Sequence, residues 1–173
     1  SMVMNYCLPW RRRAPVAEEG GEVIRYKVLI DADACPRKVM EIIRKAQGEY
    51  GYDLVIVSSF NHRHSVEGEG VHHVYVGDEE QAADLAIINR TLPCDIVVTQ
   101  DWGLAAVIIG KGARALDPNG RVFTESKIDF LLEERHLKAK HRRGGGRTKG
   151  PTARTKENDH RFTQAFLSLL NEA

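Results

Sequence analysis

Short apolar runs alternate along the chain with longer segments in which apolar residues recur every three or four positions. Five runs have the length and the β-branched content of strands: 25–31, 53–58, 72–76, 94–100 and 113–116. Helical spacing follows Pro36 and recurs in three further segments: 79–90, 102–109 and 125–136. Because strands that alternate with helices form parallel βαβ units, the pattern predicts an α/β fold of three layers, with a mainly parallel central sheet flanked by helices.

The composition changes at two points and predicts three parts. Residues 1–24 contain four prolines and glycines without periodicity, which is typical of a disordered N-terminal tail. Residues 25–137 hold all the predicted strands and are expected to form one α/β domain. Residues 138–173 begin with a basic stretch, which has nine Lys or Arg and two acids up to residue 161. The chain then ends with apolar residues at helical spacing, so we expect a flexible basic arm followed by a C-terminal helix that packs on the domain.

Composition and cysteine usage narrow the class of protein. Hydrophobic residues make up 42% of the chain and charged residues 28%, as in ordinary globular proteins, and the formal net charge is only +1. The apolar runs are far shorter than the ~20 residues that cross a bilayer, so no membrane association is expected. Three cysteines, an odd number at wide spacing, favour a reducing compartment over a disulfide framework. The sequence therefore predicts a cytoplasmic protein and leaves the oligomeric state open.

Acidic residues follow three of the predicted strands and occur in one predicted helix. Asp31 and Asp33 follow the first strand, Asp78 the third and Asp101 the fourth, while Asp84 lies about one turn inside the helix 79–90. The carboxyl ends of parallel strands share one edge of a sheet, so we expect these carboxylates to converge. Crowded carboxylates repel unless a divalent cation lies between them, and an all-oxygen ligand set favours Mg²⁺ or Mn²⁺. Such ions serve phosphodiester chemistry, which makes a nucleic acid the expected substrate.

Local structural roles compete with this interpretation. Asp33, Asp78 and Asp101 also lie where a helix cap or a turn residue is useful, so capping remains an alternative for each of them. Asp31 ends a fully apolar strand and has the best individual case for a functional role. The sulfur of Cys35 lies close behind in the sequence, but no partner base is identifiable, and a small buried residue is the simpler interpretation.

Several polar and basic residues are candidates for substrate binding. Ser58 and Asn61 close the second predicted strand at the same edge, where they are expected to hydrogen-bond substrate unless they serve only the turn. Basic residues of the arm and of the following helix are expected to neutralise phosphates of RNA without reading its sequence. These residues are Arg142, Arg143, Arg147, Lys149, Arg154 and Arg161. A merely solvated basic segment is the alternative.

Four stretches of the chain resemble a known family. They are Ile-Asp-Ala-Asp-Ala-Cys-Pro at 30–36, Ala-Asp-Leu-Ala-Ile at 83–87, Val-Thr-Gln-Asp-Trp-Gly-Leu-Ala at 98–105, and the segment 150–162. Together they are similar to the YaiI/YqxD family of uncharacterised bacterial proteins over residues 26–170. That family is grouped with the PIN-like nuclease superfamily. The resemblance implies a PIN-like domain over residues 25–137.

The same resemblance implies roles for the acids. Asp31, Asp84 and Asp101 would be the catalytic metal ligands, and Asp33 and Asp78 would supplement them. The chain departs from a typical PIN nuclease in having two acids, Asp31 and Asp33, in its first motif, and in carrying the basic arm with its terminal helix.

Three functions compete on these grounds. The leading hypothesis is a hydrolase, an endoribonuclease that depends on Mg²⁺ or Mn²⁺ and uses either two metal ions or a metal-activated water. The second is a haloacid-dehalogenase-like phosphatase, in which Asp31 is the nucleophile and Asp33 the acid, and in which a phosphorylated Asp31 would be trapped. The third is a non-enzymatic RNA-binding module, whose binding would depend on salt and not on metal.

Overall fold

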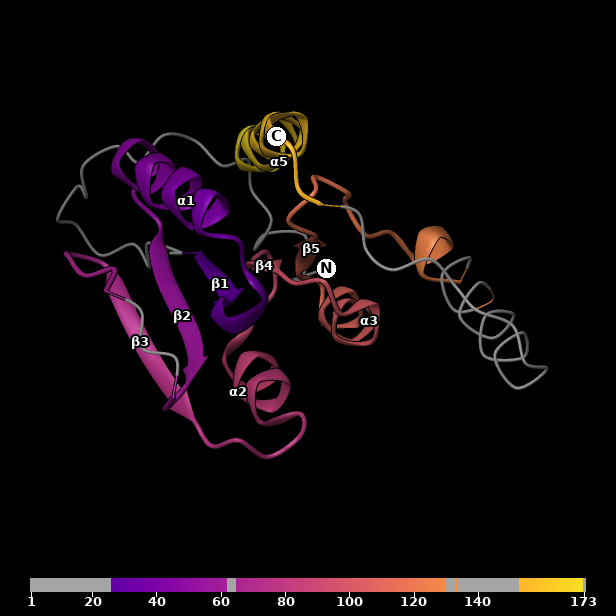
Figure 1. Ribbon diagram of the computed structural model, residues 1–173. Coiled ribbons are helices and arrows are strands. Elements are labelled where there is room, and N and C mark those ends of the chain that lie inside the picture. The colour runs from indigo at the N-terminus through magenta and orange to yellow at the C-terminus, as the bar shows by residue number, and fades with distance from the viewer. Residues whose placement is uncertain (1–25, 62–64, 130–132, 134–152, 173) are drawn as a thin grey trace, which may run out of the picture.

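Five parallel strands make up the central sheet in the part of the chain that the computed structural model describes, residues 26–61, 65–129, 133 and 153–172 (Figure 1). The strands are β1 (Lys27–Asp31), β2 (Asp53–Ser59), β3 (Val71–Val76), β4 (Ile96–Val98) and β5 (Arg114–Leu116). Every neighbouring pair is parallel, and the order across the sheet is β3-β2-β1-β4-β5. The prediction of a mainly parallel sheet is therefore confirmed.

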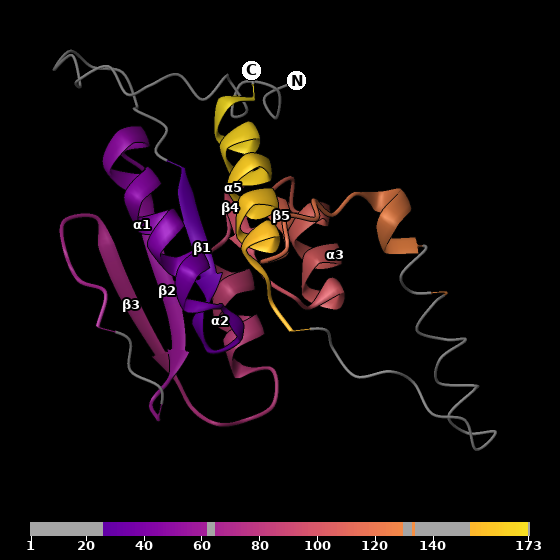
Figure 2. The same cartoon turned by 45° about the horizontal axis from the view of Figure 1, so that its top comes forward.

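Helices cover both faces of this sheet (Figures 1 and 2). α1 (Arg37–Tyr50) and α5 (Lys156–Asn171) pack on one face, and α2 (Ala82–Arg90) and α3 (Trp102–Gly110) pack on the other. A short 3-10 helix, η2 (Ala32–Ala34), links β1 to α1. Residues 125–129 are also helical, as predicted, and most of the remainder of that segment lies outside the described residues. The three-layer α/β class is thus confirmed.

Alternate side chains of each strand enter two separate cores. Val28 and Ile30 of β1 face α1 and α5, whereas Leu29 faces α2 and α3, and all three side chains are inaccessible to solvent. Because both faces are covered, a central strand must be apolar at every position. This explains why the strands appear in the sequence as continuous apolar runs. No helix within the described ranges is both long and apolar enough to span a membrane.

The connections reverse direction at the middle of the sheet. The chain runs from β1 outward through β2 to β3, and α2 then carries it back across the sheet to β4, on the other side of β1. β1 and β4 are therefore neighbours whose connections leave in opposite directions. In open α/β sheets, ligands bind outside the carboxyl ends of such a pair, since the loops there diverge and leave a crevice.

Helix α2 begins three residues later than the sequence pattern predicts. Gln81 has a φ of 66°, in the left-handed region, and this conformation excludes it from a right-handed helix. The predicted segment 79–90 is therefore shortened to Ala82–Arg90, and Asp84 lies in the first turn rather than a turn further in. The residues before Ala82 form a turn that follows the end of β3.

The C-terminal helix α5 docks against α1 and the sheet. Thr155 and Asn158 form a reciprocal capping box at its start, which satisfies backbone donors of the first turn. Phe162 and Phe166 are fully buried, together with Leu170, in the core that α1 also fills. The expected C-terminal helix is present, whereas residues 1–24 and 138–152 lie outside the described residues, so the disordered tail and the flexible arm stay predictions.

Gly120 lets the loop after β5 approach the backbone of α5. Its φ is 86°, and a Cβ atom at this position would lie 2.5 Å from the carbonyl carbon of Arg161. Replacing Gly120 by alanine should therefore lower the free energy of unfolding by about 2 kcal/mol or more, because backbone strain and a backbone clash add. Urea unfolding at 25 °C measures this loss.

Gly48 provides the matched control. It lies within α1, and an added Cβ would meet no heavy atom within 4 Å. Gly48→Ala should raise the free energy of unfolding by about 0.5–1 kcal/mol, since alanine has the higher helix propensity. Equal changes in the two variants would contradict the role given to the loop contact.

Candidate active site

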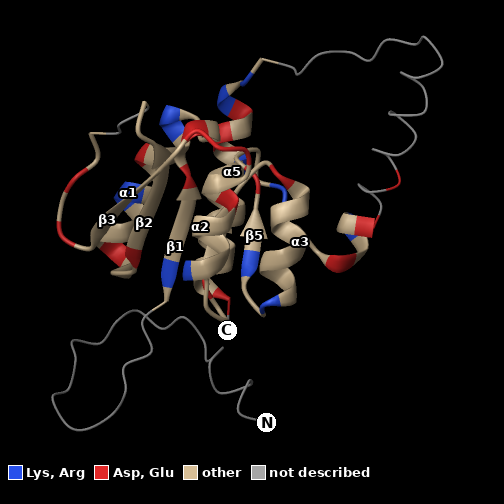
Figure 3. Cartoon of the chain, turned by 90° about the horizontal axis from the view of Figure 1, so that it is seen from below, with Lys and Arg blue, Asp and Glu red and all other residues tan. Residues whose placement is uncertain are grey.

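A hollow of about 770 Å³ lies at the carboxyl edge of the sheet, over the switch between β1 and β4. The ends of β1, β2 and β3 and the first turns of α2 and α3 surround it. Figure 3 shows acidic positions where β1 ends and where α2 and α3 begin. Seven carboxylates line the hollow: Asp31, Asp33, Asp78, Glu79, Glu80, Asp84 and Asp101. Among the described residues that line it there is no Lys, Arg or His. We refer to this hollow as the acidic pocket.

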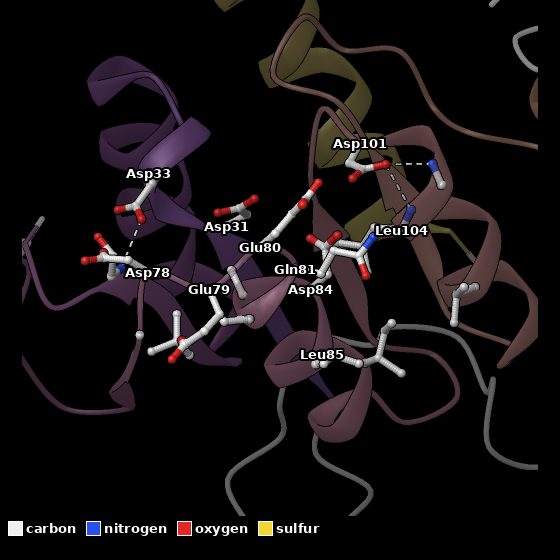
Figure 4. A pocket seen from close by; sticks show the side chains of 18 residues that line it. Asp31, Asp33, Asp78, Glu79, Glu80, Gln81, Asp84, Leu85, Asp101 and Leu104 are labelled. Carbon is white, nitrogen blue, oxygen red and sulfur yellow. Dashed lines mark hydrogen bonds between the residues drawn. The ribbon is translucent and has the colours of Figure 1, made fainter.

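Asp31 lies at the centre of the group (Figure 4). It is the last residue of β1, and its side chain is half-buried. No donor among the described residues forms a hydrogen bond with its carboxylate, and it does not cap η2. Burial, together with the charges of Asp84, Asp33 and Asp101, raises the pKa of Asp31 to about 6. The acids predicted from three distant segments therefore do converge.

Asp84 and Asp101 approach Asp31 from the other side of the switch. Asp84 lies in the first turn of α2, where burial and the nearby Asp101 raise its pKa. Asp101 is the N-cap of α3, and its Oδ1 accepts hydrogen bonds from the amides of Gly103 at 2.8 Å and Leu104 at 3.2 Å. The capping interpretation is thus correct for Asp101. The cap occupies Oδ1, and a hydrogen bond between the carboxyl groups of Asp84 and Asp101 adds to the rise in the pKa of Asp84.

Asp33 and Asp78 fix the opposite wall of the pocket. Asp33 Oδ2 accepts a hydrogen bond from the amide of Ser59 at 3.0 Å, and Asp78 Oδ2 accepts one from Asn61 Nδ2 at 2.9 Å. Both acids are exposed; Asp33 holds the last residue of β2, and Asp78 holds the turn that follows it. Asn61 therefore lies near the site as predicted, but it binds a pocket acid and is not part of the pocket lining.

Ser58 does not reach the pocket, contrary to the prediction. It is fully buried on the face of β2 that carries Leu54 and Ile56, and its Oγ has no hydrogen-bond partner. Ser59 lines the pocket instead, because successive residues of a strand point to opposite faces. The sequence alone did not reveal which face held the site, since both faces of β2 are apolar.

The basic candidates do not enter the pocket where the structure describes them. Arg154 pairs with Asp159 at 2.7 Å and donates to Asn119, while Arg161 pairs with Glu157 at 2.7 Å on the exposed side of α5. Neither lines the acidic pocket: Arg154 is engaged just before α5, and Arg161 lies on the exposed side of that helix. The remaining four candidates, Arg142, Arg143, Arg147 and Lys149, lie outside the described residues.

Cys35 is unsuited to nucleophilic catalysis. Burial raises the pKa of its thiol to about 12, so the sulfur is protonated at neutral pH. The alternative of a small buried residue is consistent with this environment.

Two pocket residues escaped the sequence interpretation. Glu79 and Glu80 line the pocket, and Figure 4 shows Glu80 pointing into the space shared by Asp31, Asp84 and Asp101. A signal was present, since the two glutamates directly follow Asp78 in an unbroken run of three acids. This run was interpreted as the start of the predicted helix, because acidic residues are common in the first turn of a helix.

The donor chemistry suits a hard divalent cation, although the side chains do not yet surround one. All the candidate ligands are carboxylate oxygens, the type that Mg²⁺ and Mn²⁺ prefer. Within the described ranges, no group of three or more His, Cys, Asp or Glu is arranged to hold a metal ion. Binding would therefore require carboxylate rotation, for which the exposed Asp101 and the partly exposed Asp84 have room.

Because the pKa of Asp31 is raised, we expect the free energy of unfolding to depend on pH. In the metal-free protein, the folded state holds this proton up to a pH of about 6, whereas an unperturbed aspartate side chain has a pKa of 3.8. The folded state then binds more protons than the unfolded state between these values, so stability falls as the pH rises through this window. Asp31→Asn removes that loss and should stabilise the chain by about 1–2 kcal/mol at pH 7.5, after allowance for partial exposure.

Urea unfolding in EDTA at pH 4 and pH 7.5 measures the difference between wild type and Asp31→Asn. The gain should be small at the lower pH and largest at the higher one. A gain that is independent of pH would contradict the crowding of charge at Asp31.

The sequence matches a bacterial family over nearly all of the described residues. The family described as "Uncharacterized BCR, YaiI/YqxD family" matches residues 29–172. A UPF0178 protein of Heliobacterium modesticaldum is 49% identical over 146 residues, which cover 84% of this chain and 97% of that protein. A UPF0178 protein of Exiguobacterium sibiricum is 46% identical over 147 residues, which cover 84% and 97% respectively.

Among solved structures, a mutant of Rae1 (YacP) from Bacillus subtilis is similar with a TM-score of 0.39 and 18% identity, covering 68% of this chain and 82% of that chain. These values are too low to support a conclusion about fold or function. The family match covers β2 to β5, most of β1 and all five predicted aspartates. The resemblance to YaiI/YqxD is therefore confirmed, while the grouping with PIN-like nucleases stays a prediction. The chain belongs to the YaiI/YqxD family.

Proposed function

We propose that this chain is a nuclease that depends on a divalent metal ion and hydrolyses RNA at the acidic pocket. The observation that carries the proposal is the charge balance of the pocket. Seven carboxylates line it without a Lys, Arg or His among the described lining residues. Such a concentration of negative charge repels a phosphodiester unless a cation intervenes, and structural caps do not require it.

Asp31, Asp84 and Asp101 would hold the ion. Asp31 contributes a carboxylate with no hydrogen-bond donor from the described chain, and Asp101 contributes the oxygen that does not cap α3. A bound divalent cation supplies Lewis-acid polarisation of a phosphodiester oxygen. Asp31 must lose its proton to act as a ligand, so binding should release protons below a pH of about 6.

Asp33 and Asp78 would mainly maintain the shape of the pocket. They hold the end of β2 through Ser59 and Asn61, and so fix the wall opposite Asp101. Their carboxylates remain at the pocket surface, where they are available as supplementary ligands. The exposed Glu80 is a further candidate ligand from the turn before α2.

RNA is favoured as the substrate for two reasons. The motif resemblance to PIN-like nucleases suggests it, and the basic segment 138–161 suits attraction to a polyanion. A phosphatase that uses Asp31 as a nucleophile is disfavoured, since no Lys lines the described part of the pocket to stabilise a phosphoryl group.

Incubation of the full chain with a labelled oligoribonucleotide tests the proposal. Cleavage is expected with Mn²⁺ or Mg²⁺ and should stop when EDTA is added. The melting temperature of the protein alone should also rise with Mn²⁺, because a ligand that binds only the folded state stabilises it. Cleavage that is unaffected by EDTA, or no cleavage with either metal, would contradict the proposal.

A further inference from the structure

An exposed aromatic ledge lies at the end of β2, one residue from the acidic pocket. Phe60 is 59% exposed and stacks on Tyr75 of β3, with 6.2 Å between the ring centroids and 20° between the ring planes. Tyr75 stacks in turn on His73, at 5.7 Å and 5°. We call these three rings the aromatic ledge. The outermost face, that of Phe60, meets solvent.

Hydrogen bonds hold the ledge at both ends. The amide of Phe60 donates to the carbonyl of Val76 at 3.2 Å, so the β2 and β3 backbones stay paired up to this residue. At the far end of the ledge, the His73 ring is hydrogen-bonded to the carbonyl of Val66. A large apolar ring that is fixed and exposed loses little conformational entropy when a flat partner covers it.

The acids of the pocket fix the position of Phe60 relative to the pocket. Ser59, just before it, donates its amide to Asp33, and Asn61, just after it, donates its side chain to Asp78. Ser59 and Val76 line the pocket, whereas Phe60 and Tyr75 are their next neighbours in the sequence. Because alternate residues point to opposite faces, the ledge lies around the strand end from the pocket.

A basic groove of about 800 Å³ extends on the α1 side of the sheet. It is lined by Arg37, Arg44 and Lys45 of α1, with one acid, Glu41, and it includes Val66, whose carbonyl holds the ledge. The groove begins at Cys35 and Arg37, just after the carboxyl end of β1, and extends along α1 to Arg44, which donates to the carbonyl of Glu67 in the loop before β3. An apolar peptide would need no cations here, whereas a nucleic-acid strand offers both flat bases and phosphates.

We infer that the aromatic ledge stacks an unpaired base of the nucleic acid, next to the phosphate that enters the acidic pocket, while the basic groove receives the phosphates that follow. This inference rests on the proposed function for the identity of the pocket. It adds a preference for single strands, because the bases of a duplex are already stacked on each other and do not present a free face. The ledge is sequence-tolerant, since every base has a flat face.

A binding assay with a single-stranded oligoribonucleotide that carries 2-aminopurine tests the inference, using the full chain with Ca²⁺ in place of Mn²⁺. Phe60→Ala should weaken binding by roughly 5- to 100-fold and reduce the change in 2-aminopurine emission. Phe60→Trp should keep both, and Phe60→Leu, which is apolar but has no ring, should lose both. Duplex RNA should bind more weakly to the wild type and respond little to Phe60→Ala.

Leu92→Ala is the matched control, because Leu92 is also 59% exposed but lies before β4, at the amino edge of the sheet. It should bind the oligonucleotide as the wild type does. The inference is overturned if Phe60→Ala binds normally, if Leu92→Ala weakens binding equally, if Phe60→Leu retains full binding, or if the wild type binds no single strand. If the wild type shows no Mn²⁺-dependent cleavage, the proposed function is contradicted. The binding measurements still decide whether the ledge stacks a base.

Discussion

Replacing Asp31 by asparagine should reduce Mn²⁺-dependent cleavage of RNA by roughly 100-fold or more, the largest effect on activity that we expect from a single substitution. Asparagine keeps the shape of the side chain but removes its charge, at the centre of the seven carboxylates. Asp84→Asn should act in the same direction, since the carboxyl group of Asp84 interacts directly with that of the remaining ligand, Asp101. Initial rates of cleavage and calorimetric titration with Mn²⁺ measure the two consequences.

Asp53→Asn is the appropriate control for these variants. Asp53 begins β2 at the amino edge of the sheet and does not line the acidic pocket, so its replacement should leave cleavage within about twofold of the wild type. The stability measurements sharpen the test. Asp31→Asn should be inactive although it is more stable than the wild type at pH 7.5, so lost activity cannot be attributed to unfolding. Cleavage by Asp31→Asn at the wild-type rate would rule out the metal site proposed here.

Replacing Phe166 by alanine should lower the free energy of unfolding by about 3–5 kcal/mol, the largest effect on stability. The side chain is fully buried on the inner side of α5, where its ring stacks on Phe162 at 5.4 Å and makes a T-shaped contact with Tyr52 at 6.1 Å between ring centroids. Its removal leaves a cavity between α5 and α1 that rigid neighbours cannot fill. Urea unfolding followed by circular dichroism measures the loss.

Gln164→Ala, on the exposed side of the same helix, should change the stability by no more than about 0.5 kcal/mol. If Phe166→Ala were equally mild, the C-terminal helix would not be an integral part of the core.

The sequence could predict the parallel sheet because the relevant signals are local. Each strand is covered on both faces and therefore appears as an apolar run, and each intervening helix shows its own period. Boundaries were less certain. The predicted start of α2 was residue 79, whereas the helix begins at Ala82 because Gln81 adopts a left-handed conformation. The residue type of Gln81 does not predict this conformation.

The sequence predicted which acidic residues lie at the candidate site better than it predicted what each of them contacts there. Asp31 and Asp101 were identified because parallel strands bring their carboxyl ends to one edge, and Asp84 was identified from its place in a predicted helix and from the motif resemblance; the structure places all three in one pocket. It also assigns Asp33 and Asp78 hydrogen bonds to the segment after β2, and it adds Glu80. These distinctions depend on distances between segments that are remote in the sequence.

The amino-acid sequence by itself determined the class of fold, the alternation of strands and helices, and the carboxylates that end the strands. Only the tertiary structure decided which face of β2 meets the pocket, so that Ser59 lines it and Ser58 is buried, and which rings stack beside it. The physical reason is that periodicity is a property of neighbouring residues. The crossing of α2 over the sheet and the pairing of β2 with β3 are set by packing between distant ones.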